Sequence, residues 1–267
     1  MVPSPQVRIL APQILETGRS GINNVASIVL AGGKGVRMKS DLPKVLHPFL
    51  GKPLILHVLD NLEKAGVTDI FVIVGYRGEL VIEAVGDRAT PVWQREQLGT
   101  GHAVMQAEEA LKGFTGKVII ACGDVPLIRP GTFRSLVAES NKEKVGAVVL
   151  TMLLENPHGY GRMIKDGAGN FVRIVEEKDA LPYEKKIREV NSGTYVFDKQ
   201  FLFEGLRHIN TNNAQGEYYL PDALLHIKAS GFRVGTVLMA DPVEGSGVNT
   251  IEELRRLEEF CRIKATG

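Results

Sequence analysis

The sequence predicts a domain of the α/β class with a mostly parallel β-sheet, on the basis of two observations. From Val25 onward, short apolar runs alternate with segments in which apolar residues recur at helical spacing, which is typical of strand–helix units around a parallel sheet. The apolar runs also lack polar alternation, which indicates strands that are buried on both faces. A chain of 267 residues is long enough to bury such a core without disulfide bonds.

The first half of the chain contains four expected strands with helices between them. We expect strands at 27–31, 70–75, 118–124 and 146–154, and helices at 53–65, 79–85, 100–111 and 132–140. Each helix is short enough to form a single crossover between neighbouring parallel strands.

The second half of the chain has a different texture after Pro157. Three expected strands with more polar alternation are separated by a turn signal, and the helical period then returns. We expect strands at 160–166, 171–177 and 189–198, a turn at 166–170, a helix at 220–229, a strand at 234–240 and a charged amphipathic helix at 251–263. Thr250 and Glu253 have the spacing of a capping box at the start of that last helix.

The organisation that follows is one domain over residues 25–267 with a small insertion at about 155–220. Residues 1–24 contain three prolines and have neither a basic start nor an uninterrupted apolar stretch, so we expect a poorly ordered extension rather than a secretory signal. The two cysteines, Cys122 and Cys261, form no disulfide framework or zinc spacing, which favours a reducing, cytoplasmic location.

Composition excludes several other classes of protein. The chain is 44% hydrophobic and carries 32 basic against 31 acidic side chains, whereas a disordered chain has lower hydrophobicity or a larger net charge. Basic and acidic residues are interleaved, so no basic patch indicates binding to nucleic acid. The longest mainly apolar stretch, 145–154, is about half of what a membrane span needs.

A glycine-rich loop after the first expected strand is the first candidate site. Gly32, Gly33 and Gly35 permit backbone conformations in which successive N–H groups cradle phosphate oxygens. Basic side chains in the same loop are Lys34, Arg37 and Lys44. The loop follows the carboxyl end of the first strand, and folds with a parallel sheet bind their ligands at the carboxyl ends of the strands. It lacks the P-loop pattern, and a turn-rich connection without a ligand is the alternative.

Asp124 is a candidate magnesium ligand because it ends the apolar strand expected at 118–124. A carboxylate there is suited to hold Mg²⁺, which prefers oxygen ligands. Asn249, just before the last helix, is a candidate second ligand. The alternative interpretation is that Asp124 caps a turn before Pro126.

The segment 94–103 is a candidate for recognition of a nucleobase. Gln94 and Gln97 carry amides that both donate and accept hydrogen bonds, Gly99 allows close approach of the backbone, and Thr100 is placed to cap a following helix. A strand, a turn and a helix start without a ligand remain the alternative. The six histidines have no ligand spacing, and Cys122 is interpreted as a small core residue.

Taken together, nine motifs resemble those of sugar-1-phosphate nucleotidylyltransferases, over residues 25–260. They occur in the order LAGGKGVRM, LPKVLH, QLGTGHAV, GDVPLI, YGRM, IVEEKDA, VNSGTYVF, NNAQGEYYLPD and GVNTIEEL. Within this family, the sequence is most similar to the uridylyltransferase domains that make UDP-N-acetylglucosamine, a precursor of the cell wall.

The resemblance implies a Rossmann-like, three-layer nucleotidyltransferase domain with a mixed, mostly parallel sheet and a small β-rich insertion that forms the sugar-binding part. It implies UTP and N-acetylglucosamine 1-phosphate as substrates and Mg²⁺ as cofactor. By position in the motifs, the implied catalytic residues are Arg37 and Lys44, and the metal ligands are Asp124 and Asn249. The implied nucleotide-binding residues are Ala31, Gly32, Gly33, Lys34, Gly35, Gln94, Gln97, Gly99, Thr100 and Gly123, and the sugar-binding residues are Gly161, Glu176, Asn191 and Tyr218.

Departures from the family pattern leave alternatives open. Gly32 stands where Ala is common in these uridylyltransferases, Val36 where Thr is usual, and Cys122 where Tyr is common. Another sugar 1-phosphate, such as a glucose type, with UTP, dTTP or CTP is therefore an alternative, and so is a catalytically silent regulatory subunit that binds nucleotide sugar. The bifunctional relatives continue into a hexapeptide-repeat acetyltransferase domain, and no such repeat is expected in this chain.

Overall fold

The computed structural model describes residues 22–266. The predicted extension at residues 1–24 lies outside the described residues up to position 21, and Asn23 and Asn24 form a turn ahead of the first strand. In residues 22–266 no helix is both long and apolar enough to cross a membrane.

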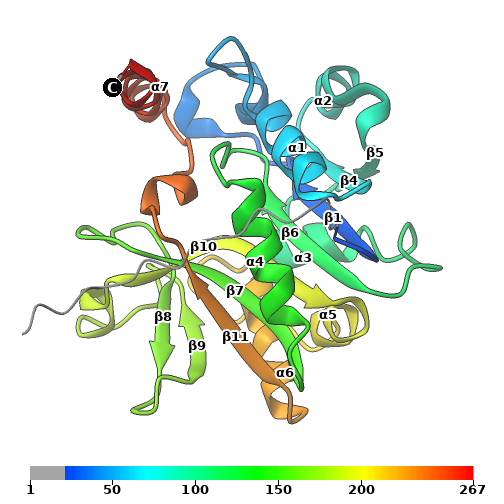
Figure 1. Ribbon diagram of the computed structural model, residues 1–267, viewed down its shortest axis with the longest axis vertical. Helices are drawn as coiled ribbons and strands as arrows, with labels where there is room; N and C mark the ends of the chain where they lie inside the picture. The colour runs from blue at the N-terminus through cyan, green and yellow to red at the C-terminus, as the bar shows by residue number, and fades with distance from the viewer. Residues whose placement is uncertain (1–21, 267) are drawn as a thin grey trace, which may run out of the picture.

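A mixed, mostly parallel sheet forms the centre of the fold (Figure 1), as the sequence predicts. The strands lie in the order β11 (Arg233–Leu238), β7 (Val145–Leu153), β10 (Glu189–Asp198), β6 (Lys117–Cys122), β1 (Val25–Leu30), β4 (Asp69–Val74) and β5 (Thr90–Trp93). Neighbours pair in parallel except β10, which runs antiparallel to both β6 and β7. The carboxyl ends of the parallel strands therefore share one edge with the start of β10.

Helices cover both faces of the sheet and give three layers. Successive residues of β1 point to opposite faces, so that Val29 joins one apolar cluster and Ile28 the other. The first cluster contains residues of α1 (Leu54–Ala65), α2 (Gly78–Val85) and α4 (Pro130–Ser140), and the second contains residues of α3 (Thr100–Met105), α5 (Lys199–Leu206) and α6 (Ala223–Ala229). In Figure 1, α1 and α4 lie in front of the sheet.

Several elements differ from the sequence prediction. The helix expected at 100–111 ends at Met105, after which the backbone forms tighter bonds such as Ala107 N–H to Val104 O at 3.0 Å. The sequence pattern does not predict the edge strand β5, which tolerates Pro91 because only one side of the strand pairs. Helix α5 is also absent from the sequence prediction; it starts with a cap, in which Asp198 Oδ1 accepts from Gln200 N–H at 3.1 Å.

The strands β8 (Arg162–Lys165) and β9 (Phe171–Val175) lie off the main path of the sheet within the predicted insertion. They form an antiparallel hairpin, and β8 also pairs with β10. The predicted turn between them is present: Asp166 Oδ1 accepts from Asn170 N–H at 2.9 Å, and Gly169 has a positive φ of 84°. This hairpin places Gly161 and Glu176 beside the start of β10.

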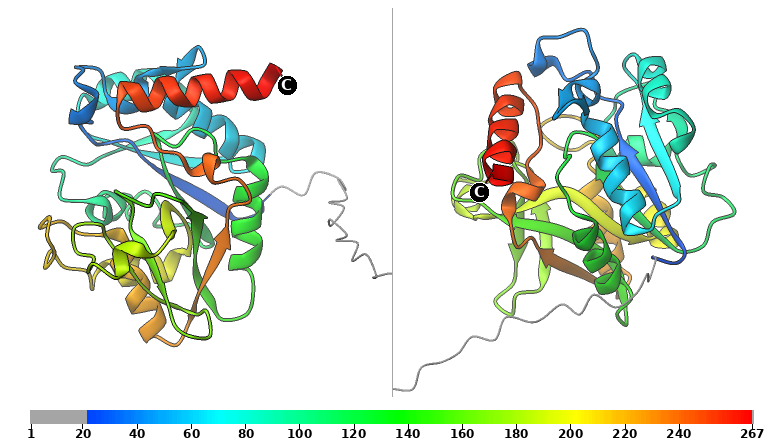
Figure 2. Two further views of the ribbon diagram at one scale, coloured as in Figure 1. Left: turned by 90° about the vertical axis from the view of Figure 1, so that its left-hand side faces the viewer. Right: turned by 45° about the horizontal axis from the view of Figure 1, so that its top comes forward.

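Helix α7 (Ile251–Thr266) packs against the loop that follows β1. Its residues Leu254 and Leu257 share an apolar cluster with Met38 and Phe49, and Figure 2 shows the helix lying along that segment. The predicted capping box is present in a modified form: Thr250 Oγ1 accepts from Glu253 N–H at 3.1 Å, while Glu253 Oε2 accepts from Asn249 N–H at 2.7 Å. The cap thus fixes the backbone of Asn249.

We predict that the guanidinium of Arg162 stabilises the hairpin. It is 2% exposed, pairs with Glu177 Oε2 at 2.7 Å and donates to the carbonyl oxygens of Tyr160 and Lys185. Arg162→Ala leaves Glu177 and these carbonyls without their donor, so we expect the free energy of unfolding to fall by about 3 kcal/mol. Arg207→Ala removes an exposed ion pair and should change stability by less than about 1 kcal/mol. Urea denaturation measures both, and equal losses would contradict the prediction.

Candidate active site

Loops that follow three parallel strands enclose a cavity of about 320 Å³ at the carboxyl edge of the sheet. Such edges are the usual ligand-binding position of open α/β sheets. Of the residues predicted to bind nucleotide, Ala31, Gly32, Gly33, Gln94, Gln97, Gly99 and Thr100 line this cavity, together with Lys44 and Asp124. The other three predicted nucleotide-binding residues, Lys34, Gly35 and Gly123, do not line it.

Close contacts restrict two glycines of the first loop, Gly32 and Gly35, whereas a Cβ at Gly33 would meet nothing within 4 Å. A Cβ at Gly32 would lie 3.1 Å from Gln94 Oε1, and a Cβ at Gly75 would lie 2.6 Å from the carbonyl oxygen of Gly32. Gly35 has a φ of 62°, and a Cβ there would lie 2.6 Å from Lys44 Cβ. The loop therefore packs directly against Gln94 on one side and Lys44 on the other.

Gln94 is buried in the wall of this cavity, and its amide has a defined orientation. Nε2 lies 3.2 Å from Gly99 O, to which it donates, and 3.1 Å from His102 Nδ1. Oε1 faces Gly32, so an acceptor is directed to the glycine loop. Tyr218 holds the neighbouring turn through its backbone, accepting from Gly101 N–H at 2.8 Å.

Thr100 does not cap the helix that it begins, contrary to the sequence prediction. The N-cap of α3 is Gly99, with no side-chain hydrogen bond. Instead, Thr100 Oγ1 accepts from Leu220 N–H at 3.1 Å, because the segment around Tyr218 crosses over the start of α3. Thr100 thereby connects this cavity with the segment that leads into α6.

The two predicted metal ligands and the two predicted catalytic residues meet at one point. Lys44 Nζ contacts Asp124 Oδ2 and lies 3.1 Å from Asn249 Oδ1, and Arg37 Nη2 donates to the same Asn249 oxygen at 2.8 Å. Val248 N–H donates to the Asp124 carbonyl at 3.0 Å, which ties the loop before α7 to the end of β6. Residues far apart in the chain thus form one cluster.

The Asp124–Asn249 pair fits a small divalent cation. Both side-chain oxygens contact a single ammonium nitrogen, so they converge on one cation position, and both are the hard donors that Mg²⁺ prefers. Among residues 22–266 no group of three or more His, Cys, Asp or Glu side chains is placed to hold a metal. Further ligands would come from water and substrate phosphate, as is usual for Mg²⁺.

A second cavity, of about 220 Å³, adjoins the first between the β8–β9 hairpin and the start of β10. The predicted sugar-binding residues Gly161, Glu176 and Asn191 line it, whereas Tyr218 does not. Asn191 is fixed by two hydrogen bonds, from Nδ2 to Tyr195 Oη at 2.6 Å and from Gly193 N–H to Oδ1 at 3.0 Å. A break in the pairing of β10 with β7 between Asn191 and Tyr195 makes this local turn possible.

Sequence reasoning missed the residues that complete this second cavity, including Tyr160, Ser192 and Tyr195. The break in β10 that places Ser192 and Tyr195 at this cavity is signalled in the sequence only by Gly193, whose φ is 79°. Cys122, interpreted as a core residue, lines both cavities, and its Sγ lies 3.6 Å from Gly193 O. Burial and the charge of Asp124 raise the pKa of Cys122 to about 12, which keeps it a neutral thiol without a role as nucleophile.

Glu176 supplies the one carboxyl group among the described residues that line the second cavity. Desolvation, followed by the charges of Asp179 and Asp222, raises its pKa to about 7. None of the residues 22–266 donates a hydrogen bond to its carboxylate. Glu176 therefore presents to the cavity a carboxyl group, and the charge of this group changes near neutral pH.

Comparisons with known proteins place the chain among nucleotidyltransferases. The MobA-like NTP transferase domain family matches residues 27–164, more than half of the chain. The bifunctional protein GlmU of Pelotomaculum thermopropionicum is 44% identical over 90% of this chain and 52% of its own length, and that of Enterococcus faecalis is 46% identical over 85% and 50%. The chain thus spans about half the length of these curated relatives.

The fold has a counterpart among solved structures. A Bacillus anthracis protein assigned as a glucose-1-phosphate thymidylyltransferase superposes with a TM-score of 0.70, covering 89% of this chain and 95% of its own. At 22% identity this likeness bears on the fold alone, and the predicted fold class is confirmed.

We predict that Glu176 makes the stability of the protein fall as pH rises. Its pKa is about 7 in the folded chain against an ordinary 4.5, so between these values the folded state binds more protons than the unfolded state. Glu176→Gln should remove this pH-dependent loss of stability. The free energy of unfolding of the variant minus that of the parent, measured by urea denaturation, should therefore rise by about 3 kcal/mol from pH 5 to pH 8.

Glu177→Gln is the matched control. Desolvation alone would raise the pKa of Glu177. The hydrogen bonds that its carboxylate accepts from Arg162 and from Gly159 N–H outweigh this effect and hold the pKa below its usual range. Its replacement should bring no gain over the same pH interval. A pH-independent difference for Glu176→Gln would show that its carboxyl group titrates normally.

Proposed function

Because the chain belongs to the family of MobA-like NTP transferase domains, we propose that it transfers a uridylyl group from UTP to N-acetylglucosamine 1-phosphate, giving UDP-N-acetylglucosamine and pyrophosphate. The nine motifs and the curated GlmU relatives at 44% to 46% identity support this assignment. Half of the length of those relatives has no counterpart here, so acetyl transfer is not part of the proposal.

The meeting of Lys44, Asp124 and Asn249 is the observation that carries the proposal. Lys44 and Asp124 of the cluster line the cavity that holds Gln94, and this cavity shares Leu30, Thr100 and Cys122 with the one that holds Glu176 and Asn191. A nucleotide in the first cavity and a sugar phosphate in the second would bring their phosphates together at the cluster. Two anions that repel each other are thus placed beside cationic groups.

The reaction would be an in-line displacement without a covalent enzyme intermediate. A phosphate oxygen of the sugar phosphate attacks the α-phosphorus of UTP; the new O–P bond forms while the bond to the bridging oxygen breaks, and its electron pair leaves with pyrophosphate. The attacking oxygen is already ionised, so no general base is needed. Correct orientation of the two reactants lowers the activation barrier by roughly 7–11 kcal/mol. Lys44 and Arg37 would stabilise the charge that develops on the phosphates.

Magnesium would be held by Asp124 and Asn249. When bound there it would neutralise phosphate charge and orient the triphosphate. The ammonium group of Lys44 contacts the same two oxygens in the chain alone, so Lys44 must turn away when the metal binds. Its freed ammonium group then has the phosphates as partners.

The orientation of Gln94 favours uracil or thymine over cytosine. Its Nε2 is used within the protein, and its Oε1 faces the glycine loop as an acceptor. Uracil and thymine carry an N–H at position 3 that can donate to such an oxygen, whereas the same position of cytosine is an acceptor. This supports UTP or dTTP as the nucleotide.

Two alternatives change the substrate or remove the reaction. A glucose-type sugar 1-phosphate with UTP or dTTP would use the same cluster and cavities, and a silent regulatory subunit would bind nucleotide sugar without turnover. Retention of Arg37, Lys44, Asp124 and Asn249 in one cluster disfavours the silent subunit.

A panel of sugar 1-phosphates against UTP, dTTP and CTP, with release of pyrophosphate as readout, tests the proposed function. We expect turnover with UTP and N-acetylglucosamine 1-phosphate in the presence of Mg²⁺, and at least tenfold lower kcat/KM for CTP, because Oε1 of Gln94 would face an acceptor. Turnover with glucose 1-phosphate and dTTP alone would support the first alternative, and binding without turnover would support the silent subunit.

We predict that Lys44→Met strengthens metal binding while it abolishes most turnover. Removal of the ammonium group frees the two oxygens, so Mn²⁺ binding without nucleotide, measured by electron paramagnetic resonance, should tighten several-fold. Turnover should fall roughly 10²- to 10³-fold because a charge-stabilising donor is lost.

Lys34→Met and Asp124→Asn complete this experiment. Lys34 lies in the same loop, 5.4 Å from the ring centroid of Tyr76, and its replacement should leave Mn²⁺ affinity unchanged. Asp124→Asn should weaken Mn²⁺ binding both with and without UTP. Unchanged Mn²⁺ affinity in Lys44→Met would contradict the displacement of Lys44, and unchanged affinity in Asp124→Asn would contradict the metal site.

A further inference from the structure

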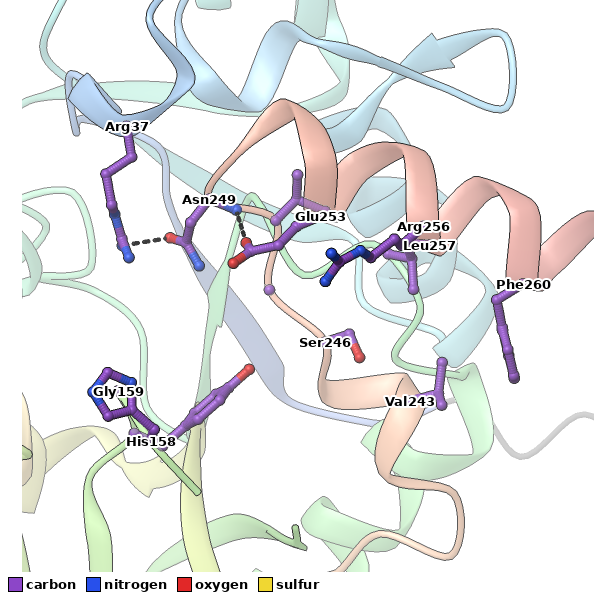
Figure 3. A pocket seen from close by; sticks show the side chains of 13 residues that line it. Arg37, His158, Gly159, Val243, Ser246, Asn249, Glu253, Arg256, Leu257 and Phe260 are labelled. Carbon is purple, nitrogen blue, oxygen red and sulfur yellow. Dashed lines mark hydrogen bonds between the residues drawn. The ribbon is translucent and has the colours of Figure 1, made fainter. Parts of the chain in front are cut away.

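A third cavity, of about 610 Å³, lies beside Asn249 and Arg37 (Figure 3). Its lining shares no residue with the first cavity, the one that holds Gln94, which is called the nucleobase cavity below. The loop 243–249, the first turns of α7 and the segment 158–160 form its walls, and Arg37 closes one end. None of the functions assigned above uses most of this space.

The cavity opens onto the catalytic cluster through Asn249 and Arg37. Arg37 Nη2 donates to Asn249 Oδ1 at 2.8 Å, and the same oxygen lies 3.1 Å from Lys44 Nζ. Lys44 and Asp124 line the nucleobase cavity, whereas Asn249 and Arg37 line this one. The proposed metal position therefore lies on the boundary between the two cavities.

Two guanidinium groups face the cavity without a carboxylate partner. Arg37 is hydrogen-bonded only to the neutral carboxamide of Asn249, and Arg256 has neither a hydrogen bond nor an ion pair among residues 22–266. The one carboxylate in the wall belongs to Glu253, and its Oε2 accepts from Asn249 N–H. Figure 3 shows the guanidinium of Arg256 directed into the cavity beside Glu253.

The charged and carboxamide side chains of the wall, those of Arg37, Asn249, Glu253 and Arg256, follow one another along one side of the cavity in Figure 3. Val243, Leu257 and Phe260 form an apolar part of the wall, with Ser246 beside Val243, and Tyr160 also lines the cavity. A compact anion rich in oxygen would therefore be bound on the side with Arg37 and Arg256. Planar guanidinium groups form paired hydrogen bonds with phosphate oxygens.

We propose that the polar side of this cavity, bounded by Arg37, Asn249 and Arg256, receives the pyrophosphate that leaves the catalytic cluster. The inference rests on the proposed function, because that reaction generates a compact polyanion at the boundary of the cavity. Arg37 contacts it on departure, and Arg256 binds it next, separating the product from the nucleotide sugar. Arg256 is thus a product-binding residue.

Binding of magnesium pyrophosphate to the full chain, measured by isothermal titration calorimetry, tests this inference. Arg256→Ala should weaken binding by roughly three- to tenfold, as expected for loss of a charge-assisted hydrogen bond at a partly exposed site. Arg255→Ala is the matched control: it removes the same charge from the next position of α7, and Arg255 does not line the cavity. Its affinity for magnesium pyrophosphate should stay within twofold of the parent.

Kinetics distinguish product binding from substrate binding and from failure of the proposed function. Arg256→Ala should raise the inhibition constant of pyrophosphate by the same factor and leave the KM of UTP within twofold. Equal effects of Arg255→Ala and Arg256→Ala, or a KM of UTP that rises as much as the inhibition constant, would overturn the inference. Absence of turnover across the substrate panel would overturn the proposed function, while the calorimetric comparison would still decide whether the cavity binds pyrophosphate.

Discussion

The candidate site depends on one ammonium group. Lys44 Nζ joins Asp124 and Asn249, which lie 80 and 205 residues further along the chain, and neither partner could be held there by local structure. Three supports fix the arrangement: the end of β6 places Asp124, the cap of α7 fixes Asn249, and the glycine at position 35 allows Lys44 to approach the loop. Long-range packing and electrostatic attraction therefore fix the positions of the same three side chains.

The sheet explains why this cluster has substrate-sized cavities around it. The parallel strands β1, β5 and β6 end at one edge, and the antiparallel strand β10 begins there. Their loops form the first cavity, and the break in β10 at Gly193 opens the second. Cys122, the last residue of β6, stands between the two, so the width of their connection depends on a small side chain.

Much of the fold and part of the site follow from local sequence pattern. The buried strands are recognisable from apolar runs, and the rule that ligands bind at strand ends singles out Gly32 and Asp124. Motif order adds the family, which the comparisons confirm. Other features have no local signal: β5 contains a proline tolerated only at an edge, α3 changes its hydrogen bonding after Met105, and Tyr160 joins the site only because the β8–β9 hairpin pairs with β10.

Charge balance in the cluster would couple the binding of the proposed metal and nucleotide. In the chain alone, the carboxylate of Asp124 is neutralised by Lys44. A divalent cation entering by itself would meet the ammonium group of Lys44, and a triphosphate entering by itself would meet the carboxylate of Asp124; both encounters are repulsive. When the two enter together, the cation takes the carboxylate and the triphosphate takes the ammonium, so each repulsion is replaced by an attraction. Under the proposed function, each ligand would therefore raise the affinity for the other by the same factor, and the site would favour the metal–nucleotide complex over either component.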